Sequence, residues 1–363
     1  MKSDAIKKRL VVALLIISVT TLINCSGKKI KIEPEDGYIF FPPLPNEPRY
    51  QYLTTFSDSG HIEKKKSKLF KFVAGADLEK PKTINKPYGI AIFEGIIYVC
   101  DIRSNAVVTL DLKERKFGYM GDRGQGKLIR PVNVIVDRND RLIFVTDMGR
   151  KQVLSYNLNG KFLKAFGKKD ELSPSGMAMD EDNLFISDVK KNQIAVMNKK
   201  NGEILFWIGK SGHDDGELFH PSNICIHDKR LYVSDMTNFR ISIFDLKGKF
   251  LESFGKIGVR PGTFTRPKGI AVDNEGRIYV VDSSFENVQV FNDKYQLLLF
   301  MFNSGTEKHN INLPAVITID YDNLEYFRKY ISPDFRAEYL LFVTSNFGKN
   351  KVNVYAFGTY EAN

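Results

Sequence analysis

Residues 87–101 read Pro-Tyr-Gly-Ile-Ala-Ile-Phe-Glu-Gly-Ile-Ile-Tyr-Val-Cys-Asp: a proline, a short apolar run, a few turn residues and a second apolar run that ends in aspartate. A degenerate copy opens at Pro314, and four full copies lie between, at 131–147, 174–188, 221–235 and 267–282. Successive prolines are 44, 43, 47, 46 and 47 residues apart, which is the period of a four-stranded propeller blade. The repetition therefore predicts an all-β propeller of six blades.

Each copy has the internal pattern of an antiparallel meander. Its apolar residues alternate or form short runs between turn residues, which is typical of strands. In the third copy we expect strands at 176–179, 184–187, 193–197 and 204–208. The dipeptide Asn201-Gly202 between the last two suits a tight hairpin. One meander cannot bury both of its faces alone, so the units are expected to pack in a ring.

Several phrases of the repeat resemble a known family. Pro-x-Gly-Ile-Ala-Val-Asp, Ile-Tyr-Val-x-Asp, Gly-Lys-Phe-Leu and Phe-Gly are similar to the NHL repeat, which builds six-bladed propellers. The resemblance covers about residues 49–357. The whole layout is similar to bacterial six-bladed-propeller lipoproteins, some of which are encoded beside multihaem cytochromes. The resemblance therefore implies the fold, and it implies a partner among exported electron-transfer proteins.

The ends of the repeat region predict how the ring closes. The last copy ends at a third strand, 351–357, and no fourth strand follows it. Residues 50–56 read Tyr-Gln-Tyr-Leu-Thr-Thr-Phe, which resembles the fourth strand of the other copies. We expect this N-terminal strand to complete the last blade and so protect both edges. The last copy also carries an insertion at 321–338, with a short helix expected at 323–330.

The N-terminus has the pattern of an export signal. A basic start precedes an apolar run of 14 residues, 10–23, which is too short to span a membrane as a helix. The sequence Leu22-Ile23-Asn24-Cys25 resembles the lipobox of bacterial lipoproteins, which implies that Cys25 is acylated. Asn24 departs from the small residue usual at that position, so an ordinary secretory signal is the alternative.

These features divide the chain into three parts. Residues 1–24 are interpreted as a signal peptide, 25–48 as a lipidated, proline-rich tether and 49–363 as the propeller. Acyl chains on one cysteine would anchor the mature protein without a membrane-spanning segment. The chain is therefore expected to be exported and membrane-anchored, and Ser26 resembles the outer-membrane sorting class if the organism is Gram-negative.

The charge of the chain indicates the kind of partner, and the positions of its cysteines indicate whether they form a disulfide. The formal net charge is +10, of which residues 1–24 contribute +3, and a remainder of +7 favours anionic partners or a negative membrane surface. Cys100 and Cys225 fall in the first and fourth copies, on opposite sides of a six-membered ring. Bridged cysteines need Cα atoms within about 7 Å, so both are expected to be free and buried.

Residues that recur in every copy are expected to serve the blade. The aspartates that end the second strands are interpreted as acceptors for backbone N–H groups of the next turn, with a ring of catalytic carboxylates as the alternative; they are Asp101, Asp147, Asp188, Asp235 and Asp282. Only His61, His220 and His309 come from three loops at one face, and a zinc site there is a second alternative. We expect neither a metal nor a cofactor, since the chain has no Cys-x-x-Cys-His haem motif.

The loops between the second and third strands differ from blade to blade. They hold seven basic residues against one acid, Glu286, with phenylalanines among them. In a propeller these loops share one face with the connections between blades, and a basic and aromatic rim there could grip a protein or an anionic polymer. The alternative is that these charges are merely solvated. The predicted binding residues are Arg103, Arg150, Lys151, Lys190, Lys191, Phe239, Arg240, Phe285 and Lys349.

The sequence thus predicts a non-catalytic envelope lipoprotein, a monomer that holds a protein or anionic polymer on this rim. An exported protein is not expected to bind nucleic acid. The alternative is an enzyme of the lyase or lactonase type, with its site at the mouth of the central channel.

Overall fold

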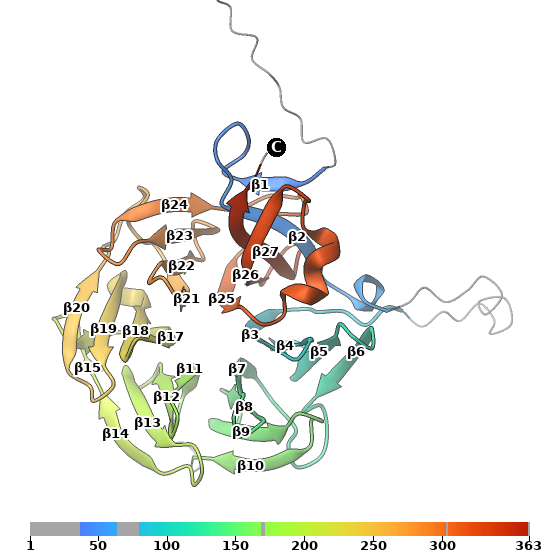
Figure 1. Ribbon diagram of the computed structural model, residues 1–363. Helices are drawn as coiled ribbons and strands as arrows, with labels where there is room; N and C mark the ends of the chain where they lie inside the picture. Colours follow the sequence, from blue (N-terminus) through green and yellow to red (C-terminus); the bar gives the residue numbers. More distant parts are fainter. Residues whose placement is uncertain (1–36, 64–79, 168–170, 303, 362–363) are drawn as a thin grey trace, which may run out of the picture. The chain divides into compact units, whose positions relative to one another are not determined.

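The computed structural model describes residues 37–63, 80–167, 171–302 and 304–361. The expected signal peptide, 1–24, and Cys25 lie outside these residues. The described strands belong to one compact unit, Tyr38–Asn363, in which six blades surround a central axis (Figure 1). No helix of the described residues is long and apolar enough to cross a membrane. The predicted six-bladed β-propeller is confirmed.

Blades 1 to 5 are four-stranded antiparallel sheets that follow one another along the chain. Blade 1 contains β3 (Pro87–Phe93), β4 (Ile96–Asp101), β5 (Ala106–Asp111) and β6 (Lys116–Met120). Blade 2 contains β7 (Pro131–Asp137), β8 (Leu142–Asp147), β9 (Gln152–Asn157) and β10 (Phe162–Phe166). Blade 3 contains β11 (Pro174–Met179), β12 (Asn183–Asp188), β13 (Gln193–Asn198) and β14 (Ile204–Ile208).

The remaining blades follow the same order. Blade 4 contains β17 (Pro221–His227), β18 (Arg230–Asp235), β19 (Arg240–Asp245) and β20 (Phe250–Phe254). Blade 5 contains β21 (Pro267–Val272), β22 (Ile278–Asp282), β23 (Asn287–Phe291) and β24 (Leu297–Met301). Blade 6 begins with β25 (Pro314–Asp320), β26 (Phe335–Ser345) and β27 (Val352–Tyr360). The short parallel pair β15 (Lys210–Ser211) and β16 (Glu217–Leu218) lies in the connection between blades 3 and 4.

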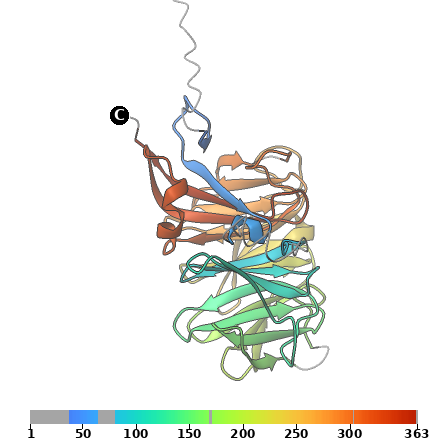
Figure 2. The ribbon, with the colours of Figure 1, turned by 90° about the vertical axis from the view of Figure 1, so that its right-hand side faces the viewer.

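The N-terminal strand closes blade 6, as the sequence predicts. β2 (Tyr50–Phe56) pairs antiparallel with β27, with Tyr50 opposite Phe357 and Phe56 opposite Val352. Figure 2 shows this N-terminal strand, in blue, beside the red strands from the C-terminal end of the chain. The sheet continues one strand further, because β1 (Ile39–Phe41) pairs with β2. The expected boundary between tether and propeller at residue 49 therefore needs correction, since residues of the expected tether form the outermost strand of this blade.

Three 3-10 helices occur in the described residues: η1 (Ser59–His61), η2 (Met236–Asn238) and η3 (Leu324–Tyr330). The last of these matches the short helix expected at 323–330. Phe327 of η3 is buried in the core between blades 6 and 1, which explains why the insertion folds onto the ring.

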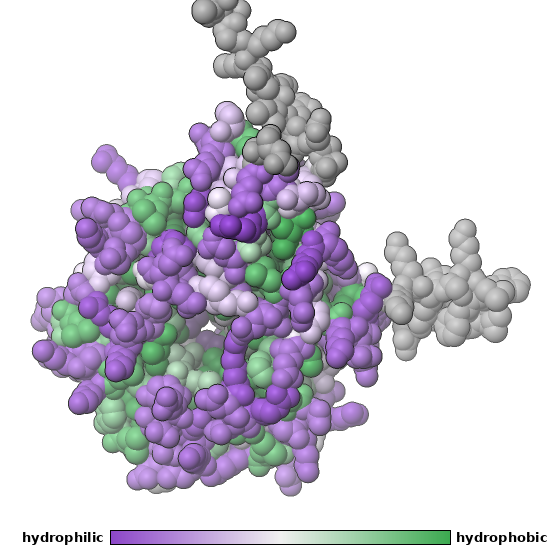
Figure 3. All heavy atoms as spheres, in the orientation of Figure 1, coloured by the Kyte–Doolittle hydropathy of each residue, from purple (hydrophilic) through white to green (hydrophobic). Residues whose placement is uncertain are grey.

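The core is divided among the junctions between blades. Six apolar clusters each join one blade to the next, and buried side chains from both partners contribute to every cluster. At the junction of blades 1 and 2, for example, Tyr98 and Val107 pack with Val145 and Tyr156. Each blade is thus stabilised by its neighbours, as expected for meanders in a ring. Figure 3 shows hydrophobic side chains at the periphery of the ring among hydrophilic ones.

The recurrent aspartates serve the blades, which confirms the structural interpretation. All five are almost completely inaccessible to solvent. Asp147, for example, accepts bonds of 2.7 to 3.0 Å from the backbone N–H groups of Ile129, Arg130, Gly149 and Arg150. One carboxylate therefore holds both the connection that enters its blade and the loop that leaves the second strand.

Glycines at the start of three innermost strands allow blades 1, 3 and 5 each to approach the following blade closely. A Cβ atom added to Gly89 or Gly176 would lie 2.5 Å from the Cα of Asn133 or Asn223 in the following blade. At Gly269 the corresponding distance, to the Cα of Val316, would be 2.7 Å. Real side chains do not tolerate such contacts, so blades 1, 3 and 5 need glycine here while blades 2, 4 and 6 do not.

Cys100 and Cys225 are both free, as predicted. Cys100 is buried in β4, but Cys225 is only half-buried. This departs from the expectation that both are buried, because Cys225 lies on β17, one of the innermost strands that line the central channel.

Candidate binding site at the channel mouth

The connections between blades and the loops that follow the second strands lie on one face of the ring. In blade 1, Pro87 at the start of β3 pairs with Asp101 at the end of β4, and blades 2 to 5 repeat this pairing; in blade 6, Pro314 pairs with Ser345. The entrance to each innermost strand is therefore beside the loop that follows the second strand. We call this the loop face.

A cavity of about 250 Å³ opens at the centre of the loop face, and residues of all six blades line it. One part of its wall comes from residues that directly follow the recurrent aspartates, and these are apolar: Ile102, Met148, Val189 and Met236. Another part comes from residues at the entrance to the innermost strands, and these include Arg130, His220, Arg266 and Lys268. Among the described residues that line it, none is acidic. We call this the mouth cavity.

The mouth cavity is electrostatically positive, and its positive groups perturb one another. Burial, and then the charges of Arg266 and Lys86, lower the pKa of Lys268 to about 8. Burial also lowers the pKa of His220, and Arg266 and Lys268 add to this effect. The charged form of His220 is therefore disfavoured in the mouth cavity.

The channel becomes apolar below the mouth cavity. A second cavity of about 280 Å³ is lined by the innermost strands, with Val134, Met177, Ile224 and Ile270 among its residues. Asn133 and Asn223 line both cavities, and the Nδ2 of Asn133 donates to the Oδ1 of Asn223 over 3.3 Å. The polar chemistry of the axis is thus concentrated on the loop face.

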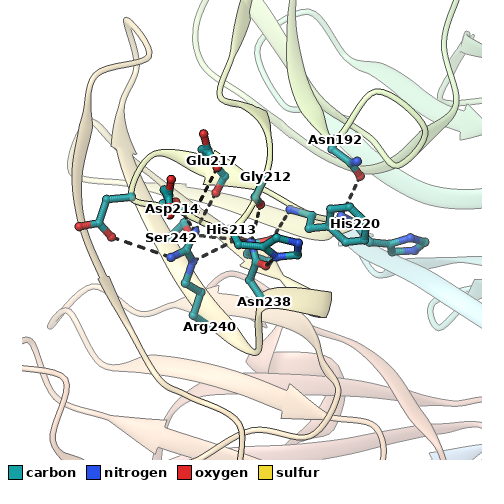
Figure 4. A network of polar contacts seen from close by, with 12 residues as sticks. Asn192, Gly212, His213, Asp214, Glu217, His220, Asn238, Arg240 and Ser242 are labelled. Atoms are coloured by element: carbon teal, nitrogen blue, oxygen red, sulfur yellow. Dashed lines mark hydrogen bonds and ion pairs between the residues drawn. The ribbon is translucent and has the colours of Figure 1, made fainter.

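Two of the predicted rim arginines are used within the fold. Arg150 Nη1 donates to the carbonyl oxygens of Gln125 and Lys127, at 2.9 and 3.0 Å. Arg240 Nε lies 3.1 Å from Asp235 Oδ2, and its Nη2 donates to the carbonyl oxygens of Asp214 and Glu217 (Figure 4). Both guanidinium groups therefore hold the connection between two blades, which is a structural role.

The connection before blade 4 is held by further polar contacts around Arg240. Asn238 Nδ2 donates to the carbonyl oxygen of Gly212, and its Oδ1 lies 2.6 Å from His213 Nδ1. His220 has a left-handed backbone with φ of 60°, and its N–H donates to Asn192 Oδ1. In Figure 4 its ring points away from the network, and His220 lines the mouth cavity.

The other predicted rim residues differ in exposure. Lys190 and Lys191 are exposed on one loop, and Lys191 Nζ lies 3.9 Å from the ring centroid of Trp207. Lys151, Phe239 and Phe285 are half-buried.

Arg103 and Lys349 are exposed, and the structure brings them together. Both line a wide cleft of about 800 Å³ on the junction of blades 6 and 1. Of the nine predicted residues, Lys190, Lys191, Arg103 and Lys349 are thus presented to solvent on the loop face.

Comparisons with known proteins agree with this architecture. Residues 213–360 match the family model described as "6-bladed beta-propeller". Human NHL repeat-containing protein 2 is 23% identical over 283 residues, which are 57% of this chain and 39% of that protein. The chain is a six-bladed β-propeller that is similar to NHL repeat-containing proteins. It matches less than half the length of each of its curated relatives.

Two enzymes of known structure share the propeller fold. A virginiamycin B lyase from Staphylococcus aureus aligns with a TM-score of 0.53 and 12% identity, over 76% of this chain and 96% of the lyase. The gluconolactonase XC5397 from Xanthomonas campestris aligns with a TM-score of 0.56 and 14% identity, over 86% of this chain and 91% of the lactonase. At these identities the likeness shows the fold alone.

The three histidines of the zinc alternative do not meet in the propeller. His220 lines the mouth cavity, His61 pairs with Asp58 over 3.1 Å, and His309 lies beside the ring of Phe41 in blade 6. Within the described ranges, no group of three or more His, Cys, Asp or Glu side chains is placed to hold a metal ion.

The sequence-based prediction missed the residues that make the mouth cavity basic. A signal was present, because a basic residue directly precedes the proline in four of the six copies, at Lys86, Arg130, His220 and Arg266. The prediction considered only the loops after the second strands. Lys268 had no such signal, since only one copy of the repeat has a basic residue at its position.

Proposed function

We propose that the propeller is a non-catalytic binding or scaffolding module that holds a protein partner on its loop face. The observation that carries this proposal is the mixture of exposed charge and exposed apolar surface on that face. Beside the four exposed basic residues, the loop face presents apolar side chains with exposed fractions of 37 to 82%: Ile129, Phe219, Ile257, Val259 and Phe347.

This composition favours a protein over a purely anionic polymer. Apolar side chains that remain exposed in a folded monomer are typical of interaction sites, and basic residues around them attract an acidic partner. The likeness to NHL repeat-containing proteins supports a scaffolding role. An anionic polymer would be held mainly by charge, so its binding should be insensitive to loss of Val259 or Phe347.

The test is a charge reversal on the loop face with a matched reversal on the opposite face. We expect the double variant Lys190→Glu/Lys191→Glu to weaken partner binding about tenfold at low salt, because each exposed charge contributes roughly 0.5–1 kcal/mol. The control is Lys200→Glu/Lys247→Glu, which changes the same charge in hairpins between the third and fourth strands. Binding would be measured by titration against the partner captured from a membrane extract.

Equal binding by the loop-face variant and the control would overturn the proposal. Arg150 and Arg240 are unsuitable for this test, since their guanidinium groups hold backbone carbonyls and their loss would perturb the fold.

The alternative function is an enzyme with its site in the mouth cavity. The fold likeness to a lyase and to a gluconolactonase supports it. Such an activity would be lost on changes to the cavity wall and would not depend on Lys190 or Lys191.

We also propose, from the sequence, that the protein is exported and anchored through acylated Cys25. The variant Cys25→Ala should move from the detergent phase to the aqueous phase on detergent partitioning, while its melting temperature stays that of the wild type. Firm partitioning of Cys25→Ala into detergent would contradict the lipobox interpretation.

A further inference from the structure

The lining of the mouth cavity includes a largely buried lysine that has no counterion among the described residues. Lys268 lies on β21, and only 8% of its surface is exposed. Its Nζ forms no hydrogen bond or ion pair with any described residue, and its one polar contact is with the ring of Tyr88, whose centroid is 5.1 Å away. Burial of an unpaired charge is unfavourable, so such groups are normally paired.

Other basic residues around Lys268 increase the excess of positive charge in the mouth cavity. Arg130 and Arg266 line the same cavity, and Lys86 lies close enough to lower the pKa of Lys268. Like charges gathered in a partly closed cavity repel one another and attract an anion from solution.

The carboxylates that end the second strands of the blades are already hydrogen-bonded within their own loops. Asp282, which ends the second strand of the same blade, is fully buried and accepts the backbone N–H groups of Thr265, Arg266, Ser284 and Phe285. Asp147 and Asp235 are held in the same manner by their own loops. None of the three lines the mouth cavity. Since no described carboxylate lines the mouth cavity, an anion from solution is the counterion that we consider for Lys268.

The shape of the cavity restricts what the anion can be. Ligand pockets for drug-sized molecules hold about 300–1,000 Å³, and the mouth cavity, at about 250 Å³, suits a smaller ligand. Between the basic residues, the lining of the cavity includes the apolar side chains of Met148, Val189 and Met236. An inorganic anion would leave these apolar side chains without contacts.

We propose that the mouth cavity binds a small organic carboxylate, whose charged group pairs with Lys268 and Arg266 and whose apolar body packs against Met148, Val189 and Met236. This goes beyond the proposed scaffolding function, because the ligand is a small molecule and the residues differ from the exposed lysines of the loop face.

The experiment uses the full chain and three probes: 3-phenylpropionate, its uncharged amide and inorganic phosphate. Isothermal titration calorimetry and ligand-observed NMR are expected to detect binding of the carboxylate and at least tenfold weaker binding of the amide and of phosphate. Equal binding of the amide, tighter binding of phosphate, or no carboxylate binding at 10 mM ligand would each overturn the proposal.

Two variants locate the site. Lys268→Met and Arg266→Gln should each weaken carboxylate binding at least tenfold, whereas Lys200→Gln, in a hairpin on the opposite face, should leave it unchanged. Unchanged binding by Lys268→Met overturns the proposal, and Arg266→Gln provides the same decision if Lys268→Met does not fold. Because Lys190 and Lys191 carry the test of the scaffolding function, failure of one hypothesis is distinguishable from failure of the other.

Proton uptake provides an independent readout. The folded-state pKa of Lys268 is about 8, below its ordinary value of 10.5, so the group is partly neutral at pH 8. A bound carboxylate favours the charged form, and calorimetry at pH 8 in two buffers of different ionisation enthalpy should show uptake of roughly half a proton per ligand. Carboxylate affinity should fall as the pH rises above 8. Lys268→Met should show neither effect.

The same pKa predicts how the stability of the Lys268→Met variant compares with that of the wild type at different pH. Since the charged form is disfavoured in the folded state, protonated Lys268 opposes folding below pH 8, and wild-type stability gains from its neutralisation between pH 8 and 10.5. The variant should therefore melt no lower than the wild type at pH 7, and its advantage should shrink as the pH approaches 10.5.

Discussion

A chain that begins at Ser57 is expected to lose the stable monomeric propeller, because it lacks the strand that closes the ring. β2 supplies the backbone partner of β27 along most of that strand, and three of its apolar side chains are more than 90% buried: Tyr50, Leu53 and Phe56. Burying such side chains contributes about 1.5–3 kcal/mol each, whereas a whole domain is stable by only about 5–15 kcal/mol. The loss is comparable to the total stability.

The measurement compares two truncated chains. One begins at Gly37 and keeps β1 and β2, and the other begins at Ser57. We expect the first to elute as a monomer and to melt cooperatively by circular dichroism, and the second to aggregate through the exposed edge of β27. Should the chain from Ser57 be monomeric and melt at the same temperature, the closing strand would be dispensable.

Asp273 is the second position where a large effect is expected, because it joins blades 5 and 6. This fully buried carboxylate lies 2.6 Å from Arg277 Nε, and its Oδ2 accepts a 2.7 Å hydrogen bond from Tyr339 on β26. Tyr279 connects the same network to Tyr50 of the closing strand, through contacts of 2.6 and 3.0 Å between hydroxyl groups. Removing one partner of a buried ion pair typically destabilises a protein by about 3–5 kcal/mol.

Asp273→Ala is therefore expected to lower the free energy of unfolding in urea by about 3–5 kcal/mol. Asp245→Ala is a matched control, since Asp245 is a half-exposed carboxylate that accepts the N–H groups of Lys247 and Lys249 in a hairpin of blade 4. Its loss should be about 1 kcal/mol. Equal losses for the two variants would show that the seam between blades 5 and 6 is no more critical than a surface turn.

The sequence predicts the fold well, because the same pattern of proline, apolar runs and aspartate recurs from blade to blade. The spacing of the prolines predicts six blades, and residues 50–56 match β2 completely. β1 was missed for a physical reason. It is three residues long and stands beside Pro42, Pro43 and Pro45, so its composition indicates a tether and only pairing with β2 makes it a strand.

The candidate site was predicted less well, because side-chain direction depends on contacts between blades. The sequence shows that Arg150 and Arg240 lie in loops of one face, but it does not show that backbone carbonyls of neighbouring connections accept their hydrogen bonds. In the sequence, Lys268 is indistinguishable from an ordinary strand residue. Its burial without a counterion results from the packing of six blades around the axis.

The close contacts of Gly89, Gly176 and Gly269 give the ring a threefold periodicity within its sixfold outline. Odd blades contribute the glycine and even blades the backbone that it touches. A single inserted blade would bring two like partners together at one junction, either two glycines with a void or two larger residues that clash. A homologue with a different number of blades is therefore expected to gain or lose them in pairs, and the natural unit of duplication in this architecture is a blade doublet.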